Sequence, residues 1–165
     1  MSPSFVLHES DDTFLATAPN RYVHVVDIAA PPSAVWAALT ADDALVSWSG
    51  AVTGMRWISP RPYGIGSTRV VTLAGAAALT ERFYRWDDER RMTFTVDSAS
   101  IPGLRRFAED IDLTPSPTGT RLTWTFAVEG GAALRPLLRL SGPITNRLTA
   151  SIARGIVRKV DTPVH

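Results

Sequence analysis

The chain has 165 residues, a formal net charge of +1 and no cysteine. This length is enough for one domain with a substantial core, and the balanced charge argues against nucleic-acid binding, which needs a basic stripe. The lack of cysteine excludes disulfides and thiolate metal sites. No segment resembles a signal peptide or approaches the length of a membrane span, so we expect a cytoplasmic protein with no membrane insertion.

The first 20 residues hold two short apolar runs on either side of a polar turn. We expect residues 1–20 to form an extra hairpin or an N-terminal arm. Residues 21–29, RYVHVVDIA, are rich in aromatic and β-branched residues and predict a strand. This strand should end at Pro31-Pro32, because proline interrupts strand pairing.

Two short helices should follow the first strand. Proline suits the first turn of a helix, and residues 33–40 place their large apolar side chains on one side. Asp42-Asp43 is typical of a helix cap, which predicts a second short helix ending near Trp48.

After Gly50 the pattern changes to a series of strands divided by turns rich in Gly, Pro and Asp. Such consecutive strands predict an antiparallel meander. The expected strands are 52–58, 67–74, 79–86, 91–97, 105–113 and 120–129.

The last long stretch, residues 132–160, has the period of an amphipathic helix. Gly142-Pro143 predicts either a kink or a short helix followed by a longer one. The apolar residues that recur three or four apart are Leu137, Leu140, Ile144, Leu148, Ile152 and Ile156.

These elements predict an α+β fold, with a seven-stranded curved antiparallel sheet, two short helices after the first strand, and a long C-terminal helix over the concave face. We expect residues 21–160 to form a single domain and residues 161–165 to form a C-terminal tail.

Four phrases of the sequence resemble one known family. They are IAAPPSAVWAAL (28–39), GIGST (64–68), ERF followed by WDDERRM (81–92), and GTRLTW (119–124). In this order they resemble the polyketide cyclase/dehydrase family of the START-like (SRPBCC, Bet v 1-like helix-grip) superfamily. The resemblance implies a deep apolar cavity between the sheet and the long helix, used for hydrophobic small molecules. Some relatives cyclise or aromatise polyketides, and many only bind or carry a ligand.

The alternation of side chains along each strand indicates which residues face this cavity. In the last strand Leu122, Trp124, Phe126 and Val128 form the apolar, inward set. The same logic places Glu109 inward beside Phe107 and Ile111. In the strand 79–86 the inward set is Leu79, Glu81 and Phe83, although Tyr84 and Trp86 make the opposite phase nearly as apolar. In the first strand His24 shares a face with Tyr22, Val26 and Ile28.

Glu109 and His24 are therefore the candidate catalytic residues. A carboxylate in an apolar pocket has a raised pKa and is suited to act as a general acid. With His24 it would form a minimal pair for enolising a ketone, closing a ring by aldol attack or expelling water. The alternatives are that each group is tied down by an arginine or a tyrosine hydroxyl, or that Glu109 anchors a phenol or an amine without chemistry.

The remaining candidate site residues would line the cavity or its entrance. We expect the loop 98–104 to form an entrance lip, because it carries two aliphatic side chains that would otherwise be exposed. The predicted ligand-binding residues are Trp48, Trp57, Glu81, Phe83, Phe94, Ile101, Leu104, Phe107, Trp124, Phe126, Ile144, Leu148 and Ile152.

No metal site or cofactor is predicted, because the three histidines are scattered and the paired aspartates lie at caps or turns. From the aromatic lining and the few inward ionisable groups we expect a carrier that binds a polyketide-like or lipid-like molecule. We expect a monomer or homodimer. The alternatives are a polyketide cyclase, aromatase or dehydratase, and a protein-interaction module.

Overall fold

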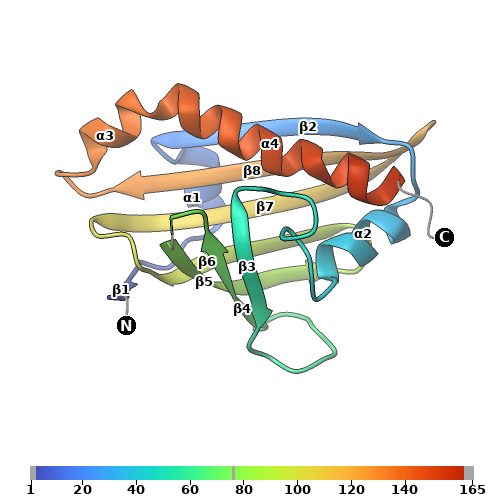
Figure 1. The fold of residues 1–165 in the computed structure, drawn as a ribbon, viewed down its shortest axis with the longest axis horizontal. Helices are drawn as coiled ribbons and strands as arrows, with labels where there is room; N and C mark the ends of the chain where they lie inside the picture. Colours follow the sequence, from blue (N-terminus) through green and yellow to red (C-terminus); the bar gives the residue numbers. More distant parts are fainter. Residues whose placement is uncertain (1–2, 76, 162–165) are drawn as a thin grey trace.

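The computed structural model describes residues 3–75 and 77–161. A strongly curled antiparallel sheet crosses the molecule, and the C-terminal helix lies over its concave face (Figure 1). The main path of the sheet is β2-β8-β7-β6-β5-β4-β3. Its strands are β2 (Asn20–Ile28), β3 (Val52–Trp57), β4 (Thr68–Leu73), β5 (Ala77–Asp87), β6 (Arg91–Ala99), β7 (Leu104–Ser116) and β8 (Gly119–Gly130). The predicted seven-stranded sheet and its covering helix are confirmed.

The N-terminal segment completes the sheet and does not form the predicted hairpin or a loose arm. Strand β1 (Phe5–Val6) pairs with the last residues of β6, and His8 N donates to the carbonyl of Arg105 in β7. Helix α1 (Asp12–Thr17) then buries Phe14 and Leu15 on the other face of the sheet, against Ala108 and Ala127. Small side chains at these two strand positions leave room for the helix.

Of the two helices expected after the first strand, the first forms and the second is replaced by turns. Helix α2 (Pro32–Thr40) is regular, with proline in its first turn. Residues 42–48 form consecutive turns in place of a second helix, although Ser47 N donates to Asp43 O as it would in one. Leu45 has φ 68°, which interrupts the helical path and turns this side chain toward the core.

The C-terminal stretch forms a short helix followed by a longer one, which is one of the two predicted outcomes. Helix α3 (Arg135–Leu140) and helix α4 (Gly142–Asp161) meet at Ser141. The hydrogen bond from Thr145 N to the Ser141 carbonyl spans the junction. Asp161 ends α4, and the rest of the predicted tail, 162–165, lies outside the described residues.

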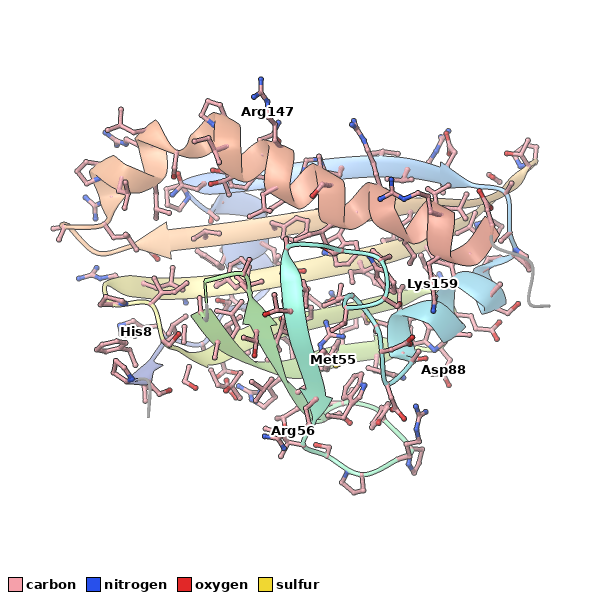
Figure 2. All side chains as sticks on the ribbon, viewed as in Figure 1. His8, Met55, Arg56, Asp88, Arg147 and Lys159 are labelled. Carbon is pink, nitrogen blue, oxygen red and sulfur yellow. The ribbon has the colours of Figure 1, made fainter. Side chains whose placement is uncertain are left out.

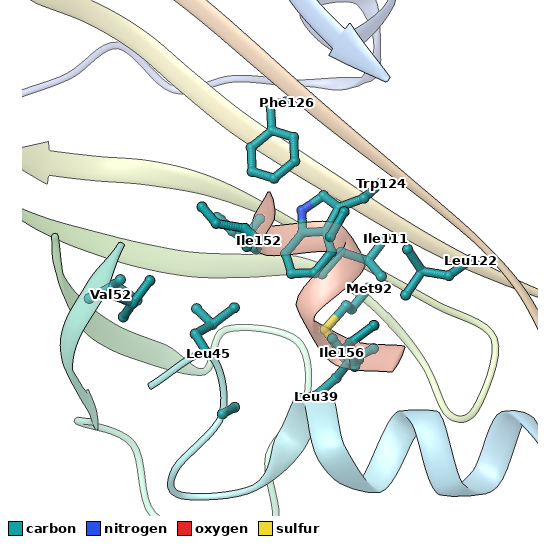
Figure 3. Packing of buried hydrophobic residues seen from close by; sticks show 14 of the residues in the cluster. Leu39, Leu45, Val52, Met92, Ile111, Leu122, Trp124, Phe126, Ile152 and Ile156 are labelled. Carbon is teal, nitrogen blue, oxygen red and sulfur yellow. The ribbon is translucent and has the colours of Figure 1, made fainter. Parts of the chain in front are cut away.

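The main core lies where α4 meets α2 and the concave face of the sheet. Figure 3 shows Trp124 and Phe126 of β8 directed toward Ile152 of α4, while Ile156 packs beside Leu39 of α2. The Trp124 and Phe126 rings stack 5.4 Å apart. Trp48 closes this side of α4, since its indole N–H donates to the Ile152 carbonyl at 3.1 Å.

We predict that Gly155→Ala destabilises the fold, although alanine normally stabilises a helix interior by about 1 kcal/mol relative to glycine. A Cβ at residue 155 would lie 2.7 Å from Cδ1 of Trp48 and 2.8 Å from its carbonyl oxygen. Overpacking of this kind costs about 1–3 kcal/mol. Urea unfolding of Gly142→Ala provides the matched control, because the nearest atom there is the Tyr22 hydroxyl at 3.9 Å. Equal stability of the two variants would contradict this packing.

Candidate functional site

Two neighbouring strands bring a carboxyl group and an indole together on the concave face. Glu109 of β7 and Trp124 of β8 both point inward, and Trp124 Nε1 donates to Glu109 Oε2 at 2.7 Å. Glu109 is buried, with 7% of its surface exposed, and Trp124 is 1% exposed. The predicted inward phase of both strands is confirmed, and Glu109 has a specific partner.

A second buried carboxyl group lies on β5 and is paired with an arginine that was not among the predicted site residues. Arg69 Nε lies 2.6 Å from Glu81 Oε2, and both side chains are almost completely buried. The two residues face each other across the β4–β5 hairpin. A register centred on the turn at Gly75 would have paired residues 69 and 81 from sequence alone.

Aromatic rings surround this arginine. The Arg69 guanidinium carbon lies 5.4 Å, 5.1 Å and 5.3 Å from the ring centres of Trp57, Phe83 and Phe94. Ring faces attract a cation, and that attraction strengthens when water is absent. These three aromatics were predicted to contact ligand, but they enclose the Arg69 side chain instead. None of the three is among the residues that line the apolar cavity described below.

Burial sets the protonation of the two carboxyl groups. Loss of water raises the pKa of Glu81, and the charge and hydrogen bond of Arg69 oppose this increase. The pKa of Glu109 is raised well above its usual value by burial and then by the negative charge of Glu81; the Trp124 N–H and Arg69 oppose the increase. We assign the charge to Glu81, which contacts the arginine, and the proton to Glu109. The trio then has no net charge.

The carboxyl groups lie at the wall of an apolar cavity of about 210 Å³ between the sheet and helices α3 and α4. Nine of its wall residues are among the candidate site residues predicted from sequence. These are Glu81, Ile101, Leu104, Phe107, Glu109, Trp124, Phe126, Ile152 and the partly exposed Leu148. Leu79 and Val128, which strand alternation placed on the inward faces, also line the wall. The structure adds Leu45, Val52, Val71, Leu73, Leu134, Leu138, Thr145 and Thr149.

Two other predicted ligand contacts lie elsewhere. Trp48 is buried against α4 and is not at the cavity entrance. Ile144 is 70% exposed and points away from the cavity. The sequence placed it inward because Leu137, Leu140, Ile144 and Leu148 continue the stripe of Ile152 and Ile156. In this part of α4 the residues that line the wall include Thr145 and Thr149. Because both are polar, the period of apolar residues did not indicate which face of the helix points inward.

His24 lies behind the cavity wall and has its own partner. Its Nε2 is 2.7 Å from the hydroxyl oxygen of Thr149, and that hydroxyl also lies 2.9 Å from the Thr145 carbonyl. The hydroxyl also lies 3.2 Å from the Asn146 carbonyl, and the tautomer of the His24 ring decides which atom donates between Nε2 and the hydroxyl. Burial and the charge of Arg154 lower the pKa of His24, which favours the neutral ring. His24 thus positions Thr149, and Glu109 is held separately by Trp124.

The loop before β7 borders the cavity as expected for an entrance lip. Ile101 and Leu104 contribute to the wall. The Gly103 carbonyl accepts a hydrogen bond from Gly131 N, at 2.8 Å, which ties the loop to the segment leading into α3.

A shift in β5 explains why both phases of this strand are apolar. The pairing with β6 is irregular between Phe83 and Arg85, so that Phe83 and Trp86 both lie on the concave side, with ring centres 5.1 Å apart. Tyr84 faces α1, where its hydroxyl donates to Asp12. An extra residue in a strand exchanges its two faces beyond the bulge.

The polar groups in the cavity wall are the carboxyl groups of Glu81 and Glu109 and the hydroxyls of Thr145 and Thr149.

In residues 3–75 and 77–161, no three His, Asp or Glu side chains form a group suited to hold a metal ion. None of the helices in this part of the chain combines the length and the apolar character that a membrane crossing requires.

A curled sheet gripping a C-terminal helix around an apolar cavity defines the START-like class of proteins. The family model described as polyketide cyclase / dehydrase and lipid transport matches residues 20–161, and the chain belongs to this family. An uncharacterised protein of Mycobacterium tuberculosis is 33% identical over 149 residues, which cover 90% of this chain and 89% of that relative.

Solved structures share the fold. A protein from Thermus thermophilus superposes with a TM-score of 0.72 at 20% identity, covering 85% of this chain and 96% of that one. A START superfamily protein from Mycobacterium smegmatis has a TM-score of 0.68 at 14% identity, covering 85% and 98%. At these identities the comparisons concern the fold alone.

We predict that Glu109→Gln reduces the loss of stability at high pH. The folded pKa of Glu109 is raised, so its contribution to stability is fully present below the ordinary glutamate pKa. That contribution is lost as the pH rises toward the folded value, because the unfolded chain releases its proton first. Urea unfolding at pH 5 and pH 8 should show a larger decrease in the parent protein than in Glu109→Gln.

Glu129→Gln, on β8, is the control and should keep the pH dependence of the parent. Each tenfold difference in proton affinity between the folded and unfolded chains corresponds to about 1.4 kcal/mol. An unchanged pH dependence in Glu109→Gln would show that Glu109 is ionised in the folded protein.

Proposed function

We propose that the protein binds a small, neutral, largely apolar molecule in the cavity beneath α3 and α4. The observation that carries this proposal is an apolar cavity with a buried carboxyl group in its wall, whose pKa is raised by burial. Apolar walls with a few placed polar groups are typical of small-molecule sites. Family membership supports the same function, because the family description includes lipid transport.

The size of the cavity limits the ligand. A cavity of about 150 Å³ accommodates benzene. At about 210 Å³, this cavity suits a molecule of one or two rings, or one end of a longer molecule that leaves through the entrance. Leu148 lies at that entrance, since it contributes to the wall and is still 43% exposed.

The charges in the wall select for a ligand without a negative charge. Glu81 already neutralises Arg69, and a second anion beside it would be buried without a partner. Protonated Glu109 carries a hydrogen that it can donate to a carbonyl oxygen, while its Oε2 accepts from Trp124. A ketone or an ester fits this arrangement better than a carboxylate does.

We predict that 2-acetylnaphthalene binds at least about tenfold more tightly than 2-naphthoate, which has the same ring system and a negative charge. Titration calorimetry of both compounds at pH 7 makes the comparison. Equal affinities, or binding of the naphthoate alone, would contradict a site built for a neutral acceptor.

Two adjacent leucines of α3 allow a test of where the ligand binds. Leu138 lines the cavity, whereas Leu137 is 58% exposed on the outer side of α3. Leu138→Phe should fill part of the cavity and weaken the binding of 2-acetylnaphthalene at least about tenfold, while Leu137→Phe should leave it unchanged. If both variants bind like the parent, the ligand site lies elsewhere.

The second candidate function is acid catalysis by Glu109, as in a polyketide cyclase or dehydratase. The neutral carboxyl group at the cavity wall favours it, because a carboxylic acid with a raised pKa can protonate a substrate near neutral pH. His24 has no direct part in this version, since it reaches the cavity only through Thr149. The reaction would be loss of water from a β-hydroxy ketone: Glu109 protonates the departing hydroxyl, and the resulting Glu109 carboxylate removes the α-proton, so that the carbon–carbon double bond forms, water leaves and the acid is regenerated.

Glu109→Gln separates binding from catalysis. Glutamine keeps an oxygen for the Trp124 N–H and an N–H donor for the ligand, but it has no acidic proton. We predict that Glu109→Gln binds 2-acetylnaphthalene with an affinity within about threefold of the parent at pH 6. If the protein dehydrates 4-hydroxy-4-phenyl-2-butanone, enone formation should stop in this variant. Undiminished turnover would exclude Glu109 as the acid.

A further inference from the structure

The two C-terminal helices expose a continuous row of large apolar side chains. Leu137, Leu140, Ile144 and Leu148 are 58%, 82%, 70% and 43% exposed. Their spacing of three or four residues places them along one line across the junction of α3 and α4. We call this line the apolar ridge. Contiguous exposed apolar surface on a folded protein marks an interaction site.

The charged side chains of α3 and α4 are all cations up to the last residue of α4, Asp161. From residue 130 to residue 160 every charged side chain is a cation, although the whole chain has a net charge of only +1. Arg135, Arg139 and Arg147 are exposed on the same helices as the ridge. Figure 2 shows Arg147 pointing out from α4, away from the sheet. The remaining cations of this stretch are Arg154, Arg158 and Lys159.

The ridge borders the entrance of the cavity. Leu148 belongs both to the ridge and to the cavity wall. The inward side of this region lines the cavity through Leu134, which precedes α3, Leu138 of α3 and Thr145 of α4. A partner that covered the ridge would therefore lie directly over the route by which a ligand enters.

We propose that α3 and the first half of α4 dock on the surface of an anionic membrane. A helix with exposed leucine and isoleucine flanked by arginine is the type that lies in the lipid interface, with its apolar side among the acyl chains and its cations at the headgroups. The partner is a lipid surface because the ridge needs an apolar phase and its arginines need a dense layer of negative charge. A twofold pair of chains would instead bring arginines of the same sign together.

This proposal goes beyond the proposed function, because it states where the protein binds in addition to what it binds. The two are tested separately, since vesicle binding is measured without a ligand in the cavity. The parent protein is centrifuged with vesicles of phosphatidylcholine alone and with vesicles containing phosphatidylglycerol. We expect cosedimentation with the anionic vesicles, at least about tenfold weaker on neutral vesicles and weakened by salt. Absence of binding to the anionic vesicles would overturn the proposal.

Variants distinguish the two parts of the surface. The double variant Leu140→Ser/Ile144→Ser removes the exposed apolar contact, and Arg135→Gln/Arg139→Gln removes two charges; each should weaken binding at least about tenfold. Both pairs lie outside the buried core, and unfolding measurements check that stability is retained. Val23→Ser/Val25→Ser is the matched control, because these valines are 42% and 57% exposed on β2.

Two results would contradict membrane docking by the ridge. One is an equal loss of vesicle binding in the β2 control. The other is a dimer by light scattering that becomes monomeric in Leu140→Ser/Ile144→Ser, which would make a second copy of the chain the partner.

Discussion

The structure depends on the balance of charge among three buried side chains. Arg69, Glu81 and Glu109 come from three strands of one sheet, and all three are buried. One cation neutralises one carboxylate, and burial beside that carboxylate raises the pKa of the second carboxyl group, which favours its protonated form. Because burying an unpaired charge is costly, burial of Glu109 favours its neutral acid form. A neutral acid can donate a hydrogen bond to a ligand in an apolar cavity. The rings of Trp57, Phe83 and Phe94 stabilise the cation, and the Trp124 N–H satisfies the acid.

The rest of the fold shapes the space in front of this trio. Curvature of the sheet leaves a hollow that α4 covers, and the Trp48 indole holds the helix at the Ile152 carbonyl. At the other end the lining of α4 changes from Ile152 and Ile156 to Thr145 and Thr149, and the hollow remains open between helix and sheet. The N-terminal segment fills the gap between β6 and β7 from outside. The packed core and the cavity thus lie next to each other along the interface between α4 and the concave face of the sheet.

Much of the fold followed from local patterns, whereas much of the site did not. Strand alternation placed Glu109 and Trp124 correctly, because one face of β8 is apolar throughout. Alternation says which face a side chain shares but not which partner fills the space, so Phe83 and Phe94 were assigned to ligand when they surround Arg69. Arg69 itself resembled an ordinary strand arginine, and only the hairpin register pairs it with Glu81. Ile144 was misplaced because an exposed apolar row cannot be distinguished from a buried one by period alone.

The most direct test is to observe the carboxyl group of Glu109 by carbon NMR in protein labelled at the glutamate side chains. The chain has few glutamates, Glu9, Glu81, Glu89, Glu109 and Glu129, so the spectra are simple. The charge balance described here predicts one resonance that stays at the protonated position at pH 7 and is missing in Glu109→Gln. If every glutamate carboxyl group is ionised at pH 7, the trio carries a net negative charge and the neutral acid does not exist.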